Sequence, residues 1–464
     1  MTRRQFVLLL MSVLIASCDH SSFRDCAVSC TAATGCPDGL ACGVEGFCRT
    51  GATATSCNGV RDAFDADTSC VCSNNDTLSC SSGQTTCGMG CVTDAPAHCR
   101  AVMPSNGIPL GSLDLVDTAI TVDDTTMFDT DTGAITGGLT RAAGTGVIAG
   151  IGFTTSGTIG VFTLHQLSVS SFGTIEFTGG RSAAFVVETS ATIDGAIDGS
   201  GGCYGTTPNC AGPGGGAGGT TTPAMGCGPG GIGEGVGSAS DPGGGGGGSR
   251  RAGAAGGADV MSTAGVGGIA CMSPMAEPLI GGSGGGIGGL GGATVPGPGG
   301  GGGGAFQLTA LETITVTGTI TVGGAGGGGG PGSDGTRGGG GGGGGGAGGS
   351  ILLEAPVVIA DGIIAANGGG GGAPGSGPTP GPNGVTGRAS TTPAAGGSGS
   401  TAGNGGNGGA GTTMPTPGIA GTTSPNGGGG GGGVGAIFIR ALAPPTLTGA
   451  VISPPAGTGD IRTN

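Results

Sequence analysis

The sequence contains no lysine and no tryptophan, and Tyr204 is its single tyrosine. All 14 cationic side chains are therefore arginines. Walker-type phosphate loops, protein kinases and Schiff-base enzymes each need a lysine, so these activities are excluded. Charged residues make up only 9% of the chain, and the net charge is −14. This acidic balance and the scarcity of aromatic residues argue against nucleic-acid binding.

Glycine is in large excess: 123 of the 464 residues are glycine and 27 are proline. This share exceeds the level at which aperiodic glycine and proline indicate low complexity. The net charge per residue is nevertheless small, which is not typical of a disordered chain. The composition is thus neither that of an ordinary globular domain nor that of a typical disordered segment.

The N-terminus has the pattern of an export signal. Arg3 and Arg4 precede an uncharged apolar run, 6–16, which is too short to span a bilayer as a helix. The run ends in Ile15-Ala16-Ser17-Cys18, which resembles the lipobox of bacterial lipoproteins. Thr2-Arg3-Arg4-Gln5-Phe6 also resembles a twin-arginine motif, so the export route stays open.

The lipobox resemblance implies that residues 1–17 are removed as a signal peptide and that Cys18 is lipidated. Residues 18–25 then form a lipidated tether. Two or three acyl chains hold a protein on a membrane where one does not. The implied partner is membrane lipid, and the implied location is the bacterial cell envelope, with the outer membrane or cell surface favoured.

Sixteen further cysteines fall into two groups, twelve within 26–99 and four within 203–271. Even local counts in an exported chain predict disulfides, and no Cys-x-x-Cys pair favours zinc. We expect 26–99 to be a small disulfide-rich module, with bridges staying within each group. The candidates are Cys26, Cys30, Cys36, Cys42, Cys48, Cys57, Cys70, Cys72, Cys80, Cys87, Cys91, Cys99, Cys203, Cys210, Cys227 and Cys271.

Asp62, Asp65 and Asp67 are weak calcium candidates, because alternating aspartates can gather oxygen ligands. The glycine and distal glutamate of an EF-hand loop are missing, so a solvated acidic turn is preferred. We predict no other metal and no cofactor.

Short apolar islands recur along the rest of the chain, each with an apolar strand, a middle strand, a glycine corner and a final strand. A unit of about twenty residues that cannot bury itself is typical of a solenoid. The absence of a helical period predicts an all-β fold, a right-handed parallel β-helix. Five units align on Phe162, Phe185, Phe306, Ile351 and Ile437, with outward positions His165, Glu188, Thr309, Glu354 and Arg440.

This alignment makes two predictions about the strand faces. The outward residues should be exposed, with His165 beside Glu188 and Glu354 beside Arg440 on neighbouring strands. Apolar residues such as Val186 also lie on the outward face, so another part of the chain must cover it.

Three glycine-rich insertions interrupt the repeats, at 199–304, 323–349 and 365–435. Pure glycine can form polyproline-II-like helices that pack side by side. We predict ordered layers of this kind, with flexible loops as the alternative. The remaining segments are the first solenoid part 112–198, its continuation 305–453 and a C-terminal tail 454–464.

The strongest candidate for a catalytic site is the stretch 193–199, which contains Asp194 and Asp198. It resembles a coil of pectin-degrading β-helix enzymes. Two carboxylates about 5–9 Å apart can act as acid and base on a glycan. The other charged clusters of those enzymes are missing, and aspartate before glycine is also common in turns.

By composition, the chain resembles glycine-rich bacterial lipoproteins with a cysteine-rich neck, of the kind described as PE-PGRS-like, although the mycobacterial PE module is missing. The resemblance is specific only at the lipobox and the neck. It implies a membrane-anchored envelope or cell-surface lipoprotein with a structural or adhesive role and no catalysis. A surface glycan or self-association is the expected contact. The alternative is a carbohydrate-active β-helix enzyme, a polysaccharide lyase or hydrolase.

Overall fold

The computed structural model divides the chain into two compact units, 1–62 and 63–464. In the first unit, β1 (Ala41–Cys42) pairs antiparallel with β2 (Cys48–Arg49). All secondary structure described is β, and none of the described residues form a helix that could cross a bilayer. The described residues are 41–42, 48–49, 70–80, 83–87, 89–93, 97–110, 113, 116–202, 210–234, 241–258, 262–289, 296–333, 339–399, 403–421 and 426–464.

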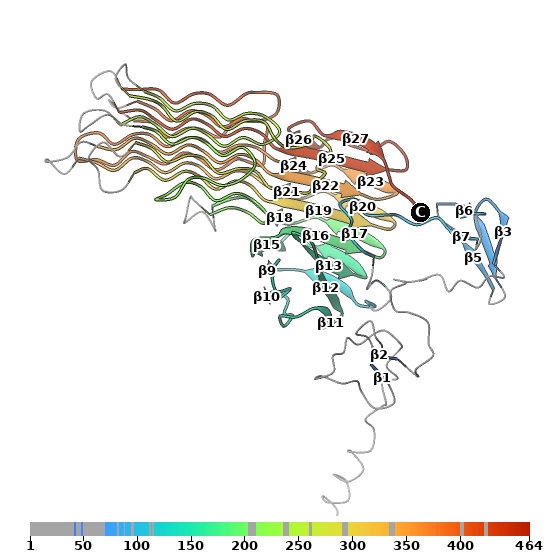
Figure 1. Cartoon of the computed structure of the whole chain (residues 1–464). Coiled ribbons are helices and arrows are strands. Elements are labelled where there is room, and N and C mark those ends of the chain that lie inside the picture. The colour runs from blue at the N-terminus through green and yellow to red at the C-terminus, as the bar shows by residue number, and fades with distance from the viewer. Residues whose placement is uncertain are drawn as a thin grey trace, which may run out of the picture. The chain divides into compact units, whose positions relative to one another are not determined.

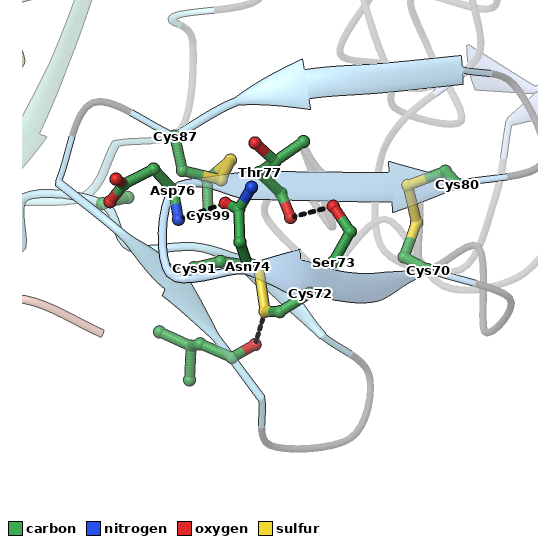
Figure 2. The surroundings of a disulfide bond; sticks show 12 residues. Cys70, Cys72, Ser73, Asn74, Asp76, Thr77, Cys80, Cys87, Cys91 and Cys99 are labelled. Carbon is green, nitrogen blue, oxygen red and sulfur yellow. Dashed lines mark hydrogen bonds between the residues drawn. A yellow bond between two sulfur atoms is a disulfide. The ribbon is translucent and has the colours of Figure 1, made fainter.

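Residues 70–99 form a small antiparallel module that three disulfides hold together (Figure 2). The bridges are Cys70–Cys80, Cys72–Cys91 and Cys87–Cys99, all within the first cysteine group, as expected. So short a segment buries little apolar surface, and the crosslinks stabilise it by restricting the unfolded chain. Its strands are β3 (Val71–Asn74), β4 (Thr77–Cys80), β5 (Gly83–Thr86), β6 (Cys91–Val92) and β7 (His98–Cys99).

Three larger sheets follow, and within 166–441 successive strands visit the five-, seven- and eight-stranded sheets in turn (Figure 1). The five-stranded sheet contains β8 (Ala119–Val122), β14 (Gln166–Val169), β17 (Ser190–Ile193), β20 (Thr313–Val316) and β23 (Val357–Ala360). The seven-stranded sheet contains β9 (Thr125–Asp129), β10 (Ile135–Gly137), β15 (Thr174–Thr178), β18 (Ala196–Asp198), β21 (Thr319–Thr321), β24 (Ile363–Ala365) and β26 (Val451–Ser453). The eight-stranded sheet contains β11 (Gly146–Ile148), β12 (Ile151–Ser156), β13 (Ile159–Leu164), β16 (Ser182–Val187), β19 (Ala305–Ala310), β22 (Ser350–Glu354), β25 (Ala436–Ala441) and β27 (Gly457–Asp460).

One apolar core joins the three sheets. Pairing from β13 to β25 in the eight-stranded sheet is parallel throughout. Phe185 and Val187 point into the main core, whereas Val186 points to the opposite side and joins a second cluster. β16 is therefore apolar on both faces and buried on both, as the sequence predicts.

The expected alignment of the repeats is wrong at one junction. β16 and β19 pair with Phe185 opposite Leu308, not opposite Phe306. The shift is two residues, so every side chain keeps its predicted face. The rings of Phe185 and Phe306 still meet edge to face, with centroids 5.4 Å apart. The other three junctions have the predicted register.

The glycine-rich insertions run side by side away from the ends of β18, β21 and β24 (Figure 1). In the segment 243–248, N–H groups three positions apart donate to the same neighbouring segment, with N···O distances of 2.8–2.9 Å. Three residues per turn is the repeat of a polyproline II helix. The donor-to-acceptor pairs are Gly243 to Gly257, Gly246 to Ala254, Gly244 to Gly342, Gly247 to Gly345, Gly245 to Gly231 and Gly248 to Gly228.

We call the hydrogen-bonded glycine segments within 199–304, 323–349 and 365–435 the glycine bundle. Its packing explains why glycine dominates. A Cβ atom placed on Gly344 would overlap the carbonyl oxygen of Gly245, and one on Gly429 would overlap that of Gly343. The segments approach so closely that only a Cα hydrogen fits between them. Glycine is therefore needed because neighbouring segments lie so close together, and not because the backbone has to be flexible.

Candidate functional site

A buried polar cluster lies on the outward face of the eight-stranded sheet. Glu354 at the end of β22 is fully buried, and its carboxylate accepts four hydrogen bonds. Ser105 donates its N–H (3.1 Å) and its hydroxyl (2.6 Å), Gln307 its amide (2.8 Å) and Thr309 its hydroxyl (2.9 Å). Burial raises the pKa of Glu354, and the Ser105 hydrogen bonds oppose that shift.

The predicted exposure of Glu354, Thr309 and Arg440 is therefore wrong, although their predicted direction is right. Glu354 does lie opposite Arg440, with Nε 3.6 Å from its carboxylate. Two irregular segments, 101–110 and 273–279, lie over these residues and remove them from water. The sequence indicated that a cover was needed but not which segment supplies it.

Arg440 links this cluster to the chain's C-terminal end. Its guanidinium pairs with Glu277 and also donates to the carbonyl of Asp460. Arg462 donates to the other oxygen of Glu277 at 2.7 Å. Burial raises the pKa of Glu277, but hydrogen bonding and charge from Arg440 outweigh it, so the pKa lies below its usual range. Apart from the buried Nε of Arg440, which has an ion-pair partner but no hydrogen-bond partner among the described residues, these polar groups bind one another. The cluster therefore joins segments of the chain.

An apolar surface lies on the glycine bundle. Val266 and Ile269 are 70% and 68% exposed, three positions apart on one segment. Ile232 lies on a neighbouring segment, where Gly231 donates to the carbonyl of Val266. Ile419 lies on another, which reaches the first through 251–258. We call Ile232, Val266, Ile269 and Ile419 the apolar face.

The regular spacing of the apolar face follows from the backbone. With three residues per turn, side chains at i and i+3 project in the same direction. Glycine at the intervening positions lets adjoining segments pack closely. Val266 and Ile269 therefore project together from a tightly hydrogen-bonded support, as side chains of a contact surface do.

The carboxylate pair that the structure brings together differs from the one the sequence singled out. Glu176 in β15 lies opposite Asp198 in β18. Burial, and then the charge of Asp198, raise the pKa of Glu176. Asp198 also accepts the N–H of Ser200 at 2.8 Å, while Asp194 is occupied by the hydroxyl of Thr317. A raised carboxyl pKa beside a second carboxylate is the minimum for acid and base catalysis.

His165 and Glu188 form the expected pair, with Nδ1 2.8 Å from the carboxylate and both side chains about a third exposed. His165 directly follows β13 and Glu188 directly follows β16, so the pair joins the ends of two neighbouring strands. It reports the register of these strands.

Several predicted site residues lie outside the described part of the chain. These are Cys18, Cys26, Cys30, Cys36, Cys57 and Cys203, with the calcium candidates Asp62, Asp65 and Asp67. Cys42 and Cys48 belong to β1 and β2. Cys227 and Cys271 form a disulfide, and Cys210 is disulfide-bonded. No group of three or more metal-binding side chains occurs among the residues that are described.

Sequence reasoning missed Glu176 and the apolar face. Glu176 lies between Ile175 and Phe177 in a strand, and the sequence pattern alone gives it no partner. Val266 and Ile269 stand alone among glycines. A three-residue spacing of apolar side chains within the glycine tracts is the signal that would have found them.

No protein-family model, no curated protein and no solved structure matches the chain.

Proposed function

We propose that the chain is an exported, lipid-anchored lipoprotein of the bacterial envelope that acts through structure or adhesion rather than catalysis. Its body would be a right-handed parallel β-helix, consistent with the fixed order in which strands visit three parallel sheets. The glycine bundle would consist of polyproline-II-like helices, consistent with its three-residue hydrogen-bond period. The disulfides favour an oxidising compartment.

The observation that carries the adhesive role is the apolar face. Val266 and Ile269 are more than two-thirds exposed although the bundle beneath them is tightly hydrogen-bonded. An exposed apolar face lowers the solubility of a protein. A contact with a solid surface, a glycan or a second copy of the chain explains why it is present. Membrane lipid bound through Cys18 would hold this surface at the cell boundary.

The anchoring is tested by cell fractionation with and without globomycin, followed by protease treatment of intact cells. We expect the wild type to incorporate labelled palmitate and to be cleaved from outside, and Cys18→Ser to remain unlabelled. Labelled Cys18→Ser protein, or wild type recovered in the cytoplasm, would contradict the proposal.

A polysaccharide lyase or hydrolase is the second candidate, and the Glu176–Asp198 pair is the observation that favours it. Glycan digestion assays on wild type and Glu176→Gln distinguish the two. Activity in the wild type that Glu176→Gln abolishes would replace the adhesive proposal with an enzymatic one.

A further inference from the structure

A shallow cavity of about 520 Å³ opens at the edge of the glycine bundle. Its lining is mostly apolar and includes two neighbouring arginines, Arg250 and Arg251. The lining residues are Arg250, Arg251, Ala252, Ala270, Met272, Pro274 and Met414. A volume of this order is typical of small-molecule sites.

The positive charges of the two arginines are available to bind a ligand. In the described part of the chain, neither the Arg250 nor the Arg251 side chain forms a hydrogen bond or an ion pair. By contrast, Arg141, Arg181 and Arg440 are all engaged by carbonyl or carboxylate oxygens. Two adjacent cations beside apolar walls attract an anion, because low-dielectric surroundings strengthen the field. A guanidinium also matches phosphate and carboxylate oxygens in geometry.

The cavity is held in shape before any ligand arrives. The carbonyl of Ser249 accepts the N–H groups of Cys271 (2.8 Å) and Met272 (3.2 Å). The Ser249 hydroxyl donates to the Met272 sulfur at 3.4 Å, and Cys271 is bonded to Cys227. The turn that carries Arg250 and Arg251 is thus pinned to the opposite wall. A preformed site loses little entropy on binding.

The cavity lies next to the segments that carry the apolar face. Ala270 follows Ile269 directly in the chain, and Ala252 belongs to the segment 251–258 that separates Ile269 from Ile419.

We propose that this cavity binds an anionic amphiphile, with a phosphate or carboxylate head group on Arg250 and Arg251. Its alkyl chain lies against Met272, Pro274 and Met414. The thioether side chains suit an alkyl chain because they adapt to irregular apolar shapes. This inference is separate from the proposed adhesive role, since it concerns one ligand in one cavity.

The test is isothermal titration calorimetry on the full chain carrying Cys18→Ser, since the absence of tryptophan removes the usual fluorescence signal. The probes are dodecyl phosphate, dodecanoate, inorganic phosphate and neutral dodecyl maltoside, all below micellar concentration. We expect saturable binding of dodecyl phosphate or dodecanoate, and at least tenfold weaker binding of inorganic phosphate and of the maltoside. Comparing dodecyl phosphate with dodecanoate shows whether the cavity prefers a phosphate or a carboxylate head group.

Arg250→Gln/Arg251→Gln should weaken binding of the preferred amphiphile at least tenfold and leave the melting temperature unchanged, because neither side chain has a partner among the described residues to lose. Arg388→Gln, an exposed arginine elsewhere on the bundle, is the matched control and should bind as wild type does. Equal affinity of the double variant and the wild type would overturn the proposal. So would inorganic phosphate or the maltoside binding as tightly as the anionic amphiphiles. Loss of adhesion by variants of the apolar face, with binding intact, would separate the two roles.

Discussion

Ser105 and Glu354 are 249 positions apart, yet the hydroxyl and the N–H of Ser105 both donate to the buried Glu354 carboxylate. This contact fixes the covering segment 101–110 on the eight-stranded sheet. Glu354→Gln would place an amide N–H₂ against hydrogen-bond donors. We expect a loss of about 1–3 kcal/mol in unfolding free energy, the usual cost of leaving buried polar groups unsatisfied. Thermal and denaturant melts measure it.

Two further variants calibrate that result. Glu312→Gln changes an exposed glutamate and should alter stability by less than about 0.5 kcal/mol. Leu353→Asp buries a charge in the main core and should destabilise more than Glu354→Gln. If Glu354→Gln behaved like Glu312→Gln, the cover over Glu354 would be absent in solution.

The sequence was informative where one segment determines its own structure. Apolar residues occupy successive positions of one strand at Phe185 and Val186. This pattern predicted that both would be buried, on opposite faces, and both are. The register between β16 and β19 was not predictable, because a two-residue shift leaves every face unchanged. The cover over Glu354 was not predictable either, since residues near Ser105 and Ala276 are irregular and have no period to recognise.

Asp241 provides a pH-dependent prediction. It is 1% exposed, its Oδ1 has no hydrogen-bond partner among the described residues, and burial raises its pKa to about 6. The native state therefore favours the protonated acid, so stability is lost as pH rises from about 4 through 6. Asp241→Asn should remove that loss and exceed the wild type in stability at pH 7.5, by on the order of 2 kcal/mol.

Melting temperatures at pH 5 and pH 7.5 measure the effect, with the exposed Asp123→Asn as the control. Parallel pH profiles for wild type and Asp241→Asn would mean that Asp241 has a partner or is hydrated.

Gly344→Ala tests the packing of the glycine bundle. The added methyl group would overlap the carbonyl oxygen of Gly245 and push two segments apart. We expect a loss of about 1–3 kcal/mol, the usual cost of overpacking. Gly180→Ala is the matched control, because a Cβ there meets only the Asp131 carboxylate, at 3.8 Å. Equal melting temperatures for the two variants would refute an ordered bundle.

The adhesive role predicts that Val266→Asp/Ile269→Asp lowers retention on hydrophobic resin and adhesion of cells to polystyrene. Each aspartate interrupts the apolar face, and both positions are exposed, so the fold should be unaffected. Phe172→Asp removes an exposed aromatic residue on the turn between β14 and β15 and is the control. Retention unchanged in the double variant, or lowered as much by Phe172→Asp, would argue against a contact through this face.

The three-residue hydrogen-bond period also dictates when the bundle can assemble. Gly342, Gly345 and Gly348 donate to Gly427, Gly430 and Gly433, and two of these acceptors in turn donate to Gly244 and Gly247. During synthesis, the segment 243–248 emerges long before 427–433 exists. Until then the carbonyl groups of Gly244 and Gly247 lack these donors, although the segment 243–248 can already pair with 228–231 and 254–257. Completion is a late, long-range event that closes large loops, which makes it slow. A chain of this design reaches its final form only after nearly all of it has left the ribosome, and a nascent product halted before residue 427 has no closed bundle to protect it from proteases.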